Sequence, residues 1–390
     1  MEKIKLGIIG IGNIGSSHVK NIMEGKIQNV ELTAVADRSE ARRKWCNEIL
    51  PETVEIFEEG TELVCSDLCD AVLIAVPHYQ HPVLAMLAFE KGKHVLCEKP
   101  AGVYTKHVRE MNEAAERSGL VFGMMFNQRT NCVYRKMKEM VEDGTIGAIR
   151  RVNWIITDWY RTQMYYDSGA WRATWAGEGG GVLLNQCPHN LDLLQWICGL
   201  PVKVQGFCHE GKWHDIEVED DVTAYLEFEN GATGVFVTTT GDAPGTNRFE
   251  ITGDKGKLVC ENDRLIFSRL AQPISEHCVT CQGGFDKPDM EVYEVETDGL
   301  NEQHPAVIRA FADNILTGGP LVADGKEGIR GLALSNAIHL SSWLGHPVAI
   351  PFDEDLFLEE LNKRRAVSRH KTGEAVVFDT ENSYGSKVKS

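Results

Sequence analysis

The first third of the chain alternates short apolar runs with amphipathic stretches of helical length. Five runs are short and apolar enough to be buried strands, and they lie at Lys5–Ile9, Glu31–Ala36, Ala71–Ala75, His94–Cys97 and Val121–Met125. Segments of helical length separate them, among them Pro82–Lys91 and Thr105–Ser118. Regular alternation of strand and helix predicts a parallel sheet with helices on both faces. We therefore predict a doubly wound α/β domain over residues 1–125.

After about residue 126 the pattern changes to longer runs joined by tight turns. A predicted helix at Val133–Asp143 is followed by a strand-like run from Ile146 to Tyr160. Runs at 221–228 and 232–240 flank Glu229-Asn230-Gly231, a strong hairpin signal, and a second hairpin is predicted around 253–256. We predict an α+β domain over residues 126–390, with a mainly antiparallel sheet, helices on one face and two helices within 304–344.

Charge and cysteine content narrow the classes of function. Forty Lys and Arg face 57 Asp and Glu, a net charge of −17. Nucleic acids and anionic membranes need clustered positive charge, so we expect neither as a partner, although a local basic pocket stays compatible. Neither a secretory leader nor an apolar run of about 20 residues is visible, and the 11 cysteines lack framework spacing. We expect a cytoplasmic protein with reduced thiols and no metal site.

The first predicted strand leads into a glycine-rich turn, Gly10-Ile11-Gly12-Asn13-Ile14-Gly15, and then into a helix. In such a unit the first glycine permits the tight turn, the second lets the backbone approach a pyrophosphate, and the third lets the helix lie close to the sheet. The N–H groups at the helix start attract the anion. This context predicts a dinucleotide site formed by Gly10, Gly12, Asn13, Ile14 and Gly15; a glycine-rich turn without a cofactor is the alternative.

Asp37 ends the second predicted strand, in Val35-Ala36-Asp37-Arg38. A carboxylate at this place accepts hydrogen bonds from the adenosine ribose and repels a 2′-phosphate, which favours NAD. Arg38 can neutralise a 2′-phosphate, so NADP remains open.

Glu98-Lys99-Pro100 follows the run His94–Cys97, at the strand end where ligands bind in such sheets. A lysine there would lie close to the nicotinamide and away from water. Burial and nearby charge can lower its pKa, so that it could serve as an acid, a base or a hydroxyl-positioning donor. By itself the tripeptide would be better explained as an ordinary surface ion pair at a strand end.

A second motif starts at Gly179-Gly180-Gly181, where three glycines let the backbone approach a ligand. Asn185 and His189 are four residues apart, so on a continuous helix they would share one face, with Pro188 in the first turn. His189 would then project toward the nicotinamide with a pKa near neutrality. A hydrogen-bonded core histidine is the alternative.

Together these motifs resemble the glucose-fructose oxidoreductase, inositol dehydrogenase and MocA family. The resemblance runs from residue 3 to about 345 and includes Val76-Pro77 with His81, and Asp324-Gly325. It implies a Rossmann domain that binds NAD or NADP, followed by an α+β domain whose large open sheet packs against a neighbouring subunit as a homodimer or homotetramer. It assigns Lys99 as the active-site lysine and His189 as the proton carrier, with Pro77, His81 and Glu98 beside the cofactor.

One position departs from the family pattern. Many dehydrogenases of the group have aspartate four residues before the histidine, where this chain has Asn185. An amide can orient an imidazole but cannot stabilise the imidazolium by charge, although Asp192 could partly substitute. The departure gives Lys99 a larger share of proton transfer and suggests a substrate unlike inositol.

Aromatic and charged residues crowd into residues 154–172. Aromatic faces stack on sugar rings, and arginines bind hydroxyls or a carboxylate. The expected substrate contacts are Lys99, Asn127, Arg129, Tyr160, Trp171, Arg172, Asn185 and His189, with Asn127 and Arg129 at the hinge between the domains.

Three functions fit these features. The leading one is hydride transfer between a nicotinamide cofactor and a carbinol or ketone of a sugar, polyol or glycoside. The second is a redox-neutral, NAD-dependent enzyme that modifies glycosides by transient oxidation and elimination. The third is a non-catalytic sugar or cofactor sensor, which would be expected to have lost Lys99.

Overall fold

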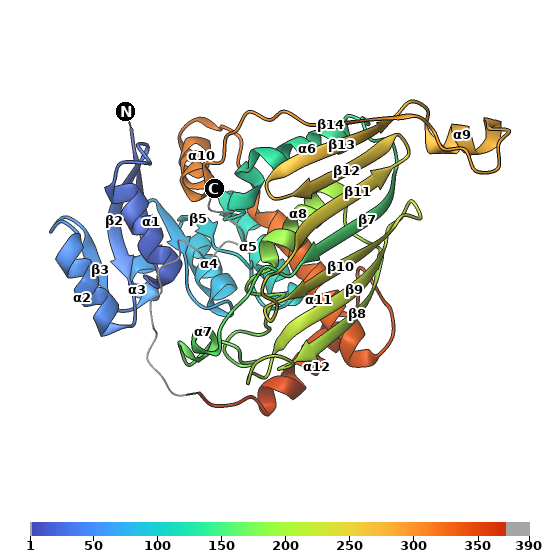
Figure 1. Ribbon diagram of the computed structural model, residues 1–390. Coiled ribbons are helices and arrows are strands. Elements are labelled where there is room, and N and C mark those ends of the chain that lie inside the picture. The colour runs from blue at the N-terminus through green and yellow to red at the C-terminus, as the bar shows by residue number, and fades with distance from the viewer. Residues whose placement is uncertain (1, 372–390) are drawn as a thin grey trace.

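The computed structural model describes residues 2–371 and contains two sheets, each covered by helices (Figure 1). The first sheet is parallel, in the order β3-β2-β1-β4-β5-β6. Its strands are β1 (Ile4–Ile9), β2 (Val30–Ala36), β3 (Glu55–Phe57), β4 (Ala71–Ile74), β5 (His94–Cys97) and β6 (Phe122–Met124). The helices between them are α1 (Asn13–Met23), α2 (Glu40–Ile49), α3 (Gly60–Cys65), α4 (Gln80–Glu90) and α5 (Thr105–Ser118).

This sheet confirms the predicted doubly wound domain. Every residue of β4 is buried, as expected for a strand covered by helices on both faces. The strand order reverses between β1 and β4, the point at which ligands bind in such sheets. Strand β3 was not predicted, because a three-residue edge strand with only partial burial leaves almost no hydrophobic pattern in the sequence.

The second sheet has nine strands in the order β14-β13-β12-β11-β7-β10-β9-β8-β15 and is mainly antiparallel, with one parallel pair, β7 and β10. Its strands are β7 (Ile149–Ile156), β8 (Lys203–Glu210), β9 (Glu219–Glu227), β10 (Thr233–Thr239), β11 (Asn247–Gly253), β12 (Gly256–Glu261), β13 (Arg264–Leu270), β14 (Met290–Glu294) and β15 (Val348–Ala349). Both predicted hairpins are present, as β9–β10 and β11–β12. The predicted strand 146–160 is too long, however.

The chain leaves the sheet after Ile156, and its backbone then bonds to loops instead of strands. The Thr157 N–H donates to Thr246 O at 2.7 Å, and the Arg161 N–H donates to Thr240 O at 2.9 Å. Residues 157–162 therefore form a loop that turns toward the first domain, although their aromatic composition resembles a strand.

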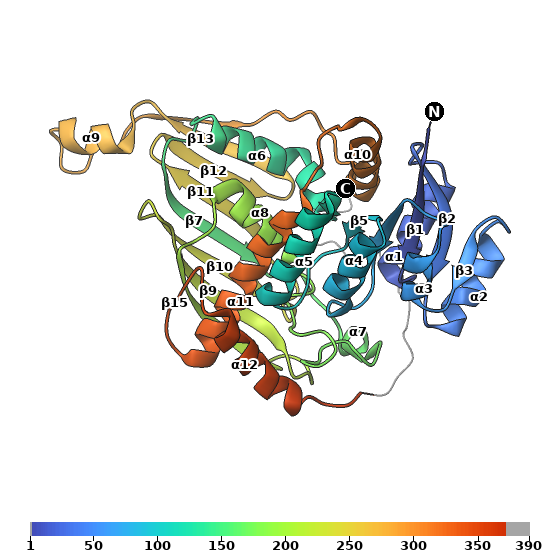
Figure 2. The same cartoon turned by 180° about the vertical axis from the view of Figure 1, so that it is seen from behind.

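Helices cover one face of the second sheet, as Figure 2 shows from behind. The remaining helical segments are η1 (Asn127–Thr130), α6 (Cys132–Glu142), α7 (Gln163–Asp167), α8 (Pro188–Cys198), α9 (Ile274–Thr280), α10 (Gln303–Thr317), η2 (Gly325–Glu327), α11 (Gly328–Leu344) and α12 (Glu354–Ala366). Trp154 of β7 points into the covered core and stacks on Phe249 of β11 with ring centroids 4.1 Å apart. On the opposite face, side chains such as Ile155 and Tyr225 are exposed.

A helix from the second part of the chain contributes to the hydrophobic core of the first domain. Phe311 and Ile308 of α10 pack into the hydrophobic core that contains β1 of the first sheet. Between η1 and α8, Arg129 donates through Nε and Nη2 to the Asp192 carboxylate at 2.8 and 2.7 Å, and both side chains are buried.

Within residues 2–371 there is no helix with the length and apolar character needed to cross a membrane.

We expect Arg129→Ala to lower the free energy of unfolding by about 3–5 kcal/mol, because it leaves the Asp192 carboxylate buried without its partner. The measurement is urea unfolding followed by circular dichroism. Arg135→Ala is the matched control: Arg135 pairs with Asp298 at 2.9 Å on the surface, so its loss should cost at most about 1 kcal/mol. Equal effects of the two substitutions would contradict the prediction.

Candidate active site

A cavity of about 880 Å³ lies between the carboxyl ends of the first sheet and the start of α8. Most of the residues predicted for the site line it. They are Gly10, Gly12, Asn13, Ile14, Asp37, Arg38, Pro77, His81, Glu98, Lys99, Tyr160, Trp171, Arg172, Asn185 and His189. The cavity therefore joins the glycine-rich turn to both chemical motifs.

The three glycines of the turn occupy different surroundings. Gly10 has φ +91°, and a Cβ there would lie 2.4 Å from Ala75 O. Gly15 lies behind the cavity, where a Cβ would lie 1.9 Å from Gly10 O, so only glycine lets α1 approach the turn. At Gly12, in contrast, no heavy atom of the described chain other than those of its immediate neighbours in sequence lies within 4 Å of a Cβ position. The open space at Gly12 fits a pyrophosphate approached by bare backbone.

Asp37 is fixed at the end of β2 by two backbone donors. Its carboxylate accepts from Ile11 N at 2.6 Å and from Ser39 N at 2.8 Å. The neighbouring Arg38 is largely exposed and pairs with Glu59 at 2.9 Å. The positive charge of Arg38, which could bind the 2′-phosphate of NADP, is therefore already paired with a carboxylate. These contacts fit an adenosine ribose at this end of the cavity.

At the end of β5, Lys99 is partly buried and donates from Nζ to Asn185 O at 2.9 Å. Burial lowers the pKa of Lys99 and outweighs the carboxylates of Glu98 and Glu178, which raise it, while two nearby guanidinium groups lower it further. Beneath it, Glu98 accepts a hydrogen bond from His18 Nε2 at 2.7 Å and another from Lys99 N at 3.2 Å. Burial alone would raise the pKa of Glu98, but the interactions with His18 dominate and the pKa falls to about 2. Glu98 therefore stays anionic at the strand end.

His189 lies in the first turn of α8 and is 4% exposed. Neither ring nitrogen has a hydrogen-bond partner among the residues that the structure describes. Burial holds the pKa of His189 well below its ordinary value, and the charge of Lys99 acts in the same direction. The near-neutral pKa expected from sequence is thus wrong in direction, because the imidazole is more deeply buried than its helical spacing revealed.

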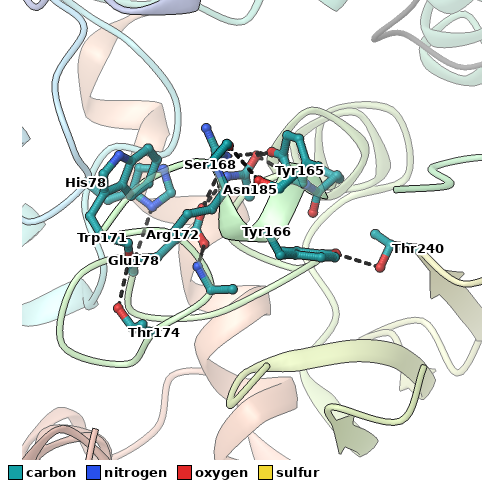
Figure 3. A network of polar contacts seen from close by, with 12 residues as sticks. His78, Tyr165, Tyr166, Ser168, Trp171, Arg172, Thr174, Glu178, Asn185 and Thr240 are labelled. Atoms are coloured by element: carbon teal, nitrogen blue, oxygen red, sulfur yellow. Dashed lines mark hydrogen bonds and ion pairs between the residues drawn. The ribbon is translucent and has the colours of Figure 1, made fainter. Parts of the chain in front are cut away.

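Asn185 does not share a helical face with His189, because α8 begins only at Pro188. Asn185 instead lies in the preceding turn and joins a polar network (Figure 3). Its carbonyl accepts from Lys99, its amide oxygen accepts from Tyr165 OH at 3.2 Å, and its amide nitrogen donates to the buried Glu178. Asp192, expected as a substitute carboxylate, is bound to Arg129 instead.

Arg172 completes this network on the loop after α7. Its Nη1 donates to Tyr165 OH at 2.6 Å, and its guanidinium carbon lies 4.4 Å and 4.7 Å from the ring centroids of Tyr165 and Trp171 (Figure 3). Glu178 lies 3.9 Å away, beyond hydrogen-bond distance.

Two residues expected at the substrate lie outside the cavity. Asn127 is fully buried and bonds to Gln303, and Arg129 is held by Asp192 and Glu327. They follow the last strand of the first sheet as predicted, but η1 turns their side chains into the packing between the domains.

Sequence reasoning missed Glu178, His18 and the role of Tyr165. Glu178 immediately precedes the glycine triplet, and His18 lies on the buried side of α1. A carboxylate beside a triplet of small residues and a histidine on a buried helix face were the available signals. No group of three or more His, Cys, Asp or Glu suited to a metal ion occurs within residues 2–371.

Two protein-family models match this chain. The oxidoreductase family with an NAD-binding Rossmann fold matches residues 4–126, and the GFO/IDH/MocA C-terminal domain matches residues 134–259. Among curated relatives, the myo-inositol 2-dehydrogenase of Thermotoga maritima is 26% identical over 340 residues, which cover 86% of this chain and 95% of that protein.

Solved structures agree in fold. The WlbA dehydrogenase from Bordetella pertussis in complex with NADH and UDP-GlcNAcA is 25% identical, covers 90% of this chain and 100% of its own, and gives a TM-score of 0.75. Levoglucosan dehydrogenase in complex with NADH and levoglucosan is 21% identical with the same coverage of both chains and a TM-score of 0.74.

We expect Gly12→Ala to weaken NAD binding by about tenfold or more while the free energy of unfolding without NAD stays unchanged, because the methyl group fills only the space for the pyrophosphate. Isothermal titration calorimetry and urea unfolding measure the two quantities. Gly15→Ala should instead cost about 1–3 kcal/mol of stability, because its methyl group meets Gly10 O. Normal NAD affinity in a folded Gly12→Ala variant would show that the cofactor binds elsewhere.

Proposed function

We propose, from the premise that this chain belongs to the GFO/IDH/MocA family of NAD-binding oxidoreductases, that it transfers a hydride between NAD and a carbinol or ketone carbon of a sugar, polyol or glycoside. One observation carries the proposal. The glycine-rich turn, Lys99 and His189 line the same cavity, although they come from three distant segments of the chain.

In the proposed reaction NAD supplies the hydride acceptor, and the protein positions the substrate and moves the proton. Gly12 and Asp37 would hold the pyrophosphate and the ribose. Because β5 and the glycine-rich turn end at the same edge of the sheet, Lys99 would lie near the nicotinamide end of the cofactor.

Lys99 and His189 have complementary proton states for this chemistry. The Lys99 ammonium can donate a hydrogen bond to the substrate oxygen, with the Asn185 carbonyl fixing its direction. The buried His189 imidazole is neutral, and its ring nitrogens are not used by other residues within 2–371. It can therefore take the hydroxyl proton as the hydride leaves the carbon.

The proposal also includes a homo-oligomer formed through the uncovered face of the nine-stranded sheet. Ile155, Phe207 and Tyr225 are each at least 40% exposed on strands of this sheet. Exposed apolar side chains on the face opposite the helices favour association with a second sheet.

We expect Lys99→Ala to lower kcat/KM for oxidation by about 10²–10⁴-fold, because the ammonium that donates a hydrogen bond to the substrate oxygen is lost. The assay follows absorbance of NADH over a panel of sugars, polyols and glycosides. Lys91→Ala removes an exposed lysine after α4 and should retain activity. Full activity in Lys99→Ala would remove the lysine from the mechanism, and product formation without net NADH would identify the redox-neutral reaction.

We expect a bell-shaped pH profile of kcat/KM for oxidation with both limbs displaced downward. Activity needs neutral His189, so it is lost as pH falls through a pKa below the ordinary 6.5. It also needs the Lys99 ammonium, so it is lost as pH rises through a pKa below the ordinary 10.5. The His189→Asn variant should lose the acidic limb; an unchanged acidic limb would assign it to another group.

A further inference from the structure

The ionised residues around the cavity are distributed unevenly. Its acidic lining residues are Asp37, Glu58, Glu59 and Glu98, all from the first domain; the first three lie at the adenosine end, and Glu98 lies beside Lys99. Within the described residues, no aspartate or glutamate of the second domain lines the cavity, whereas Arg161 and Arg172 do. With Lys99, these arginines place three cationic side chains against one lining carboxylate, Glu98, at the substrate end, in a chain whose net charge is −17.

The guanidinium of Arg172 is held in one place. It lies against the rings of Tyr165 and Trp171, and Tyr165 OH accepts one of its hydrogen bonds. Its Nε has no hydrogen-bond partner in the described part of the chain, and the side chain is only 11% exposed. A guanidinium that is held in place and still has an unpaired N–H group is suited to bind the two oxygens of a carboxylate or phosphate.

The nearest carboxylate of the second domain, Glu178, is buried behind this end and does not line the cavity. Its carboxylate accepts from Ala173 N at 2.5 Å and from the Asn185 amide, and it lies 3.9 Å from Arg172. Burial raises the pKa of Glu178, although Arg172 and the hydrogen bonds from Ala173 and Asn185 act against the shift. Burial lowers the pKa of Lys99, Glu98 and Glu178 raise it, and Arg161 and Arg172 lower it, so the lysine and the arginines repel one another across the site. An anion bound among them would relieve that repulsion.

We infer that the substrate is an anionic sugar, carrying a carboxylate or a phosphate ester, whose charged group binds Arg172 while its carbinol reaches Lys99 and His189. This inference rests on the proposed function and narrows its substrate class. The general negative field of the protein would repel such a substrate, and the local cations offset this.

The test measures binding and turnover of a neutral hexose and of three acidic derivatives of it: the corresponding hexuronate, the aldonate and the hexose phosphate. Each acidic sugar is compared with the neutral hexose. Binding is measured by calorimetry in the presence of NADH, where no oxidation occurs. We expect an acidic member to bind at least about tenfold more tightly than the neutral hexose, and Arg172→Gln to remove about 10- to 100-fold of that affinity, as for loss of a charge-assisted hydrogen bond. Arg172→Lys should recover only part of it, because it restores the charge without the planar donor pair.

Arg38→Gln is the matched control, because it removes a positive charge from the other end of the same cavity. It can change the cofactor KM, but the ratio of kcat/KM between the acidic and neutral sugars should stay constant. A preference for the hexuronate or aldonate identifies a carboxylate, and a preference for the hexose phosphate identifies a phosphate ester. Equal or better use of neutral sugars, or an unchanged ratio in Arg172→Gln, overturns the inference and leaves the proposed hydride transfer standing. Absence of NADH formation with every sugar in the panel would count against the proposed function itself.

Discussion

A lysine ammonium partly withdrawn from water at the end of a buried strand is costly unless acceptors and carboxylates surround it, and the rest of the site follows from this constraint. The first domain supplies Glu98, whose negative charge is secured by His18 of α1. The second domain supplies the Asn185 carbonyl. The Lys99 ammonium therefore has both its hydrogen-bond acceptor and its neighbouring carboxylate only when the two domains are packed together. The site forms as the domains pack.

The two domains contribute different parts of the site, and the type of secondary structure in each domain explains which part it contributes. Parallel strands end at a common edge, which fixes the glycine-rich turn, Asp37 and Lys99 relative to one another for any member of such a fold. The substrate end is built instead from the largely irregular segment between β7 and α8, with Tyr165 in the short helix α7 and Arg172 on the loop after it. Loops tolerate change without loss of the scaffold. Their charge therefore carries information about the substrate that the fold itself does not.

Local pattern was enough to predict the first sheet except β3, both hairpins and most of the residues that line the cavity, because strand burial, tight-turn residues and glycine spacing act over a few residues. It failed where a distant partner decides the outcome. Arg129 was predicted to contact the substrate, but its guanidinium is bound by Asp192, which lies 63 residues away in the sequence. Asn185 and His189 have helical spacing, but the helix starts between them. The position of Glu178 depends on Ala173, Asn185 and Arg172 together, which no single motif encodes.

The most direct test of this account is a crystal structure of the protein with NADH and a sugar acid, the complex in which no oxidation can proceed. We predict that one substrate oxygen lies within about 3 Å of both Lys99 Nζ and the His189 imidazole, with its carbon facing the nicotinamide. A nicotinamide bound away from these two side chains, or an ammonium and an imidazole contacting separate molecules, would contradict it.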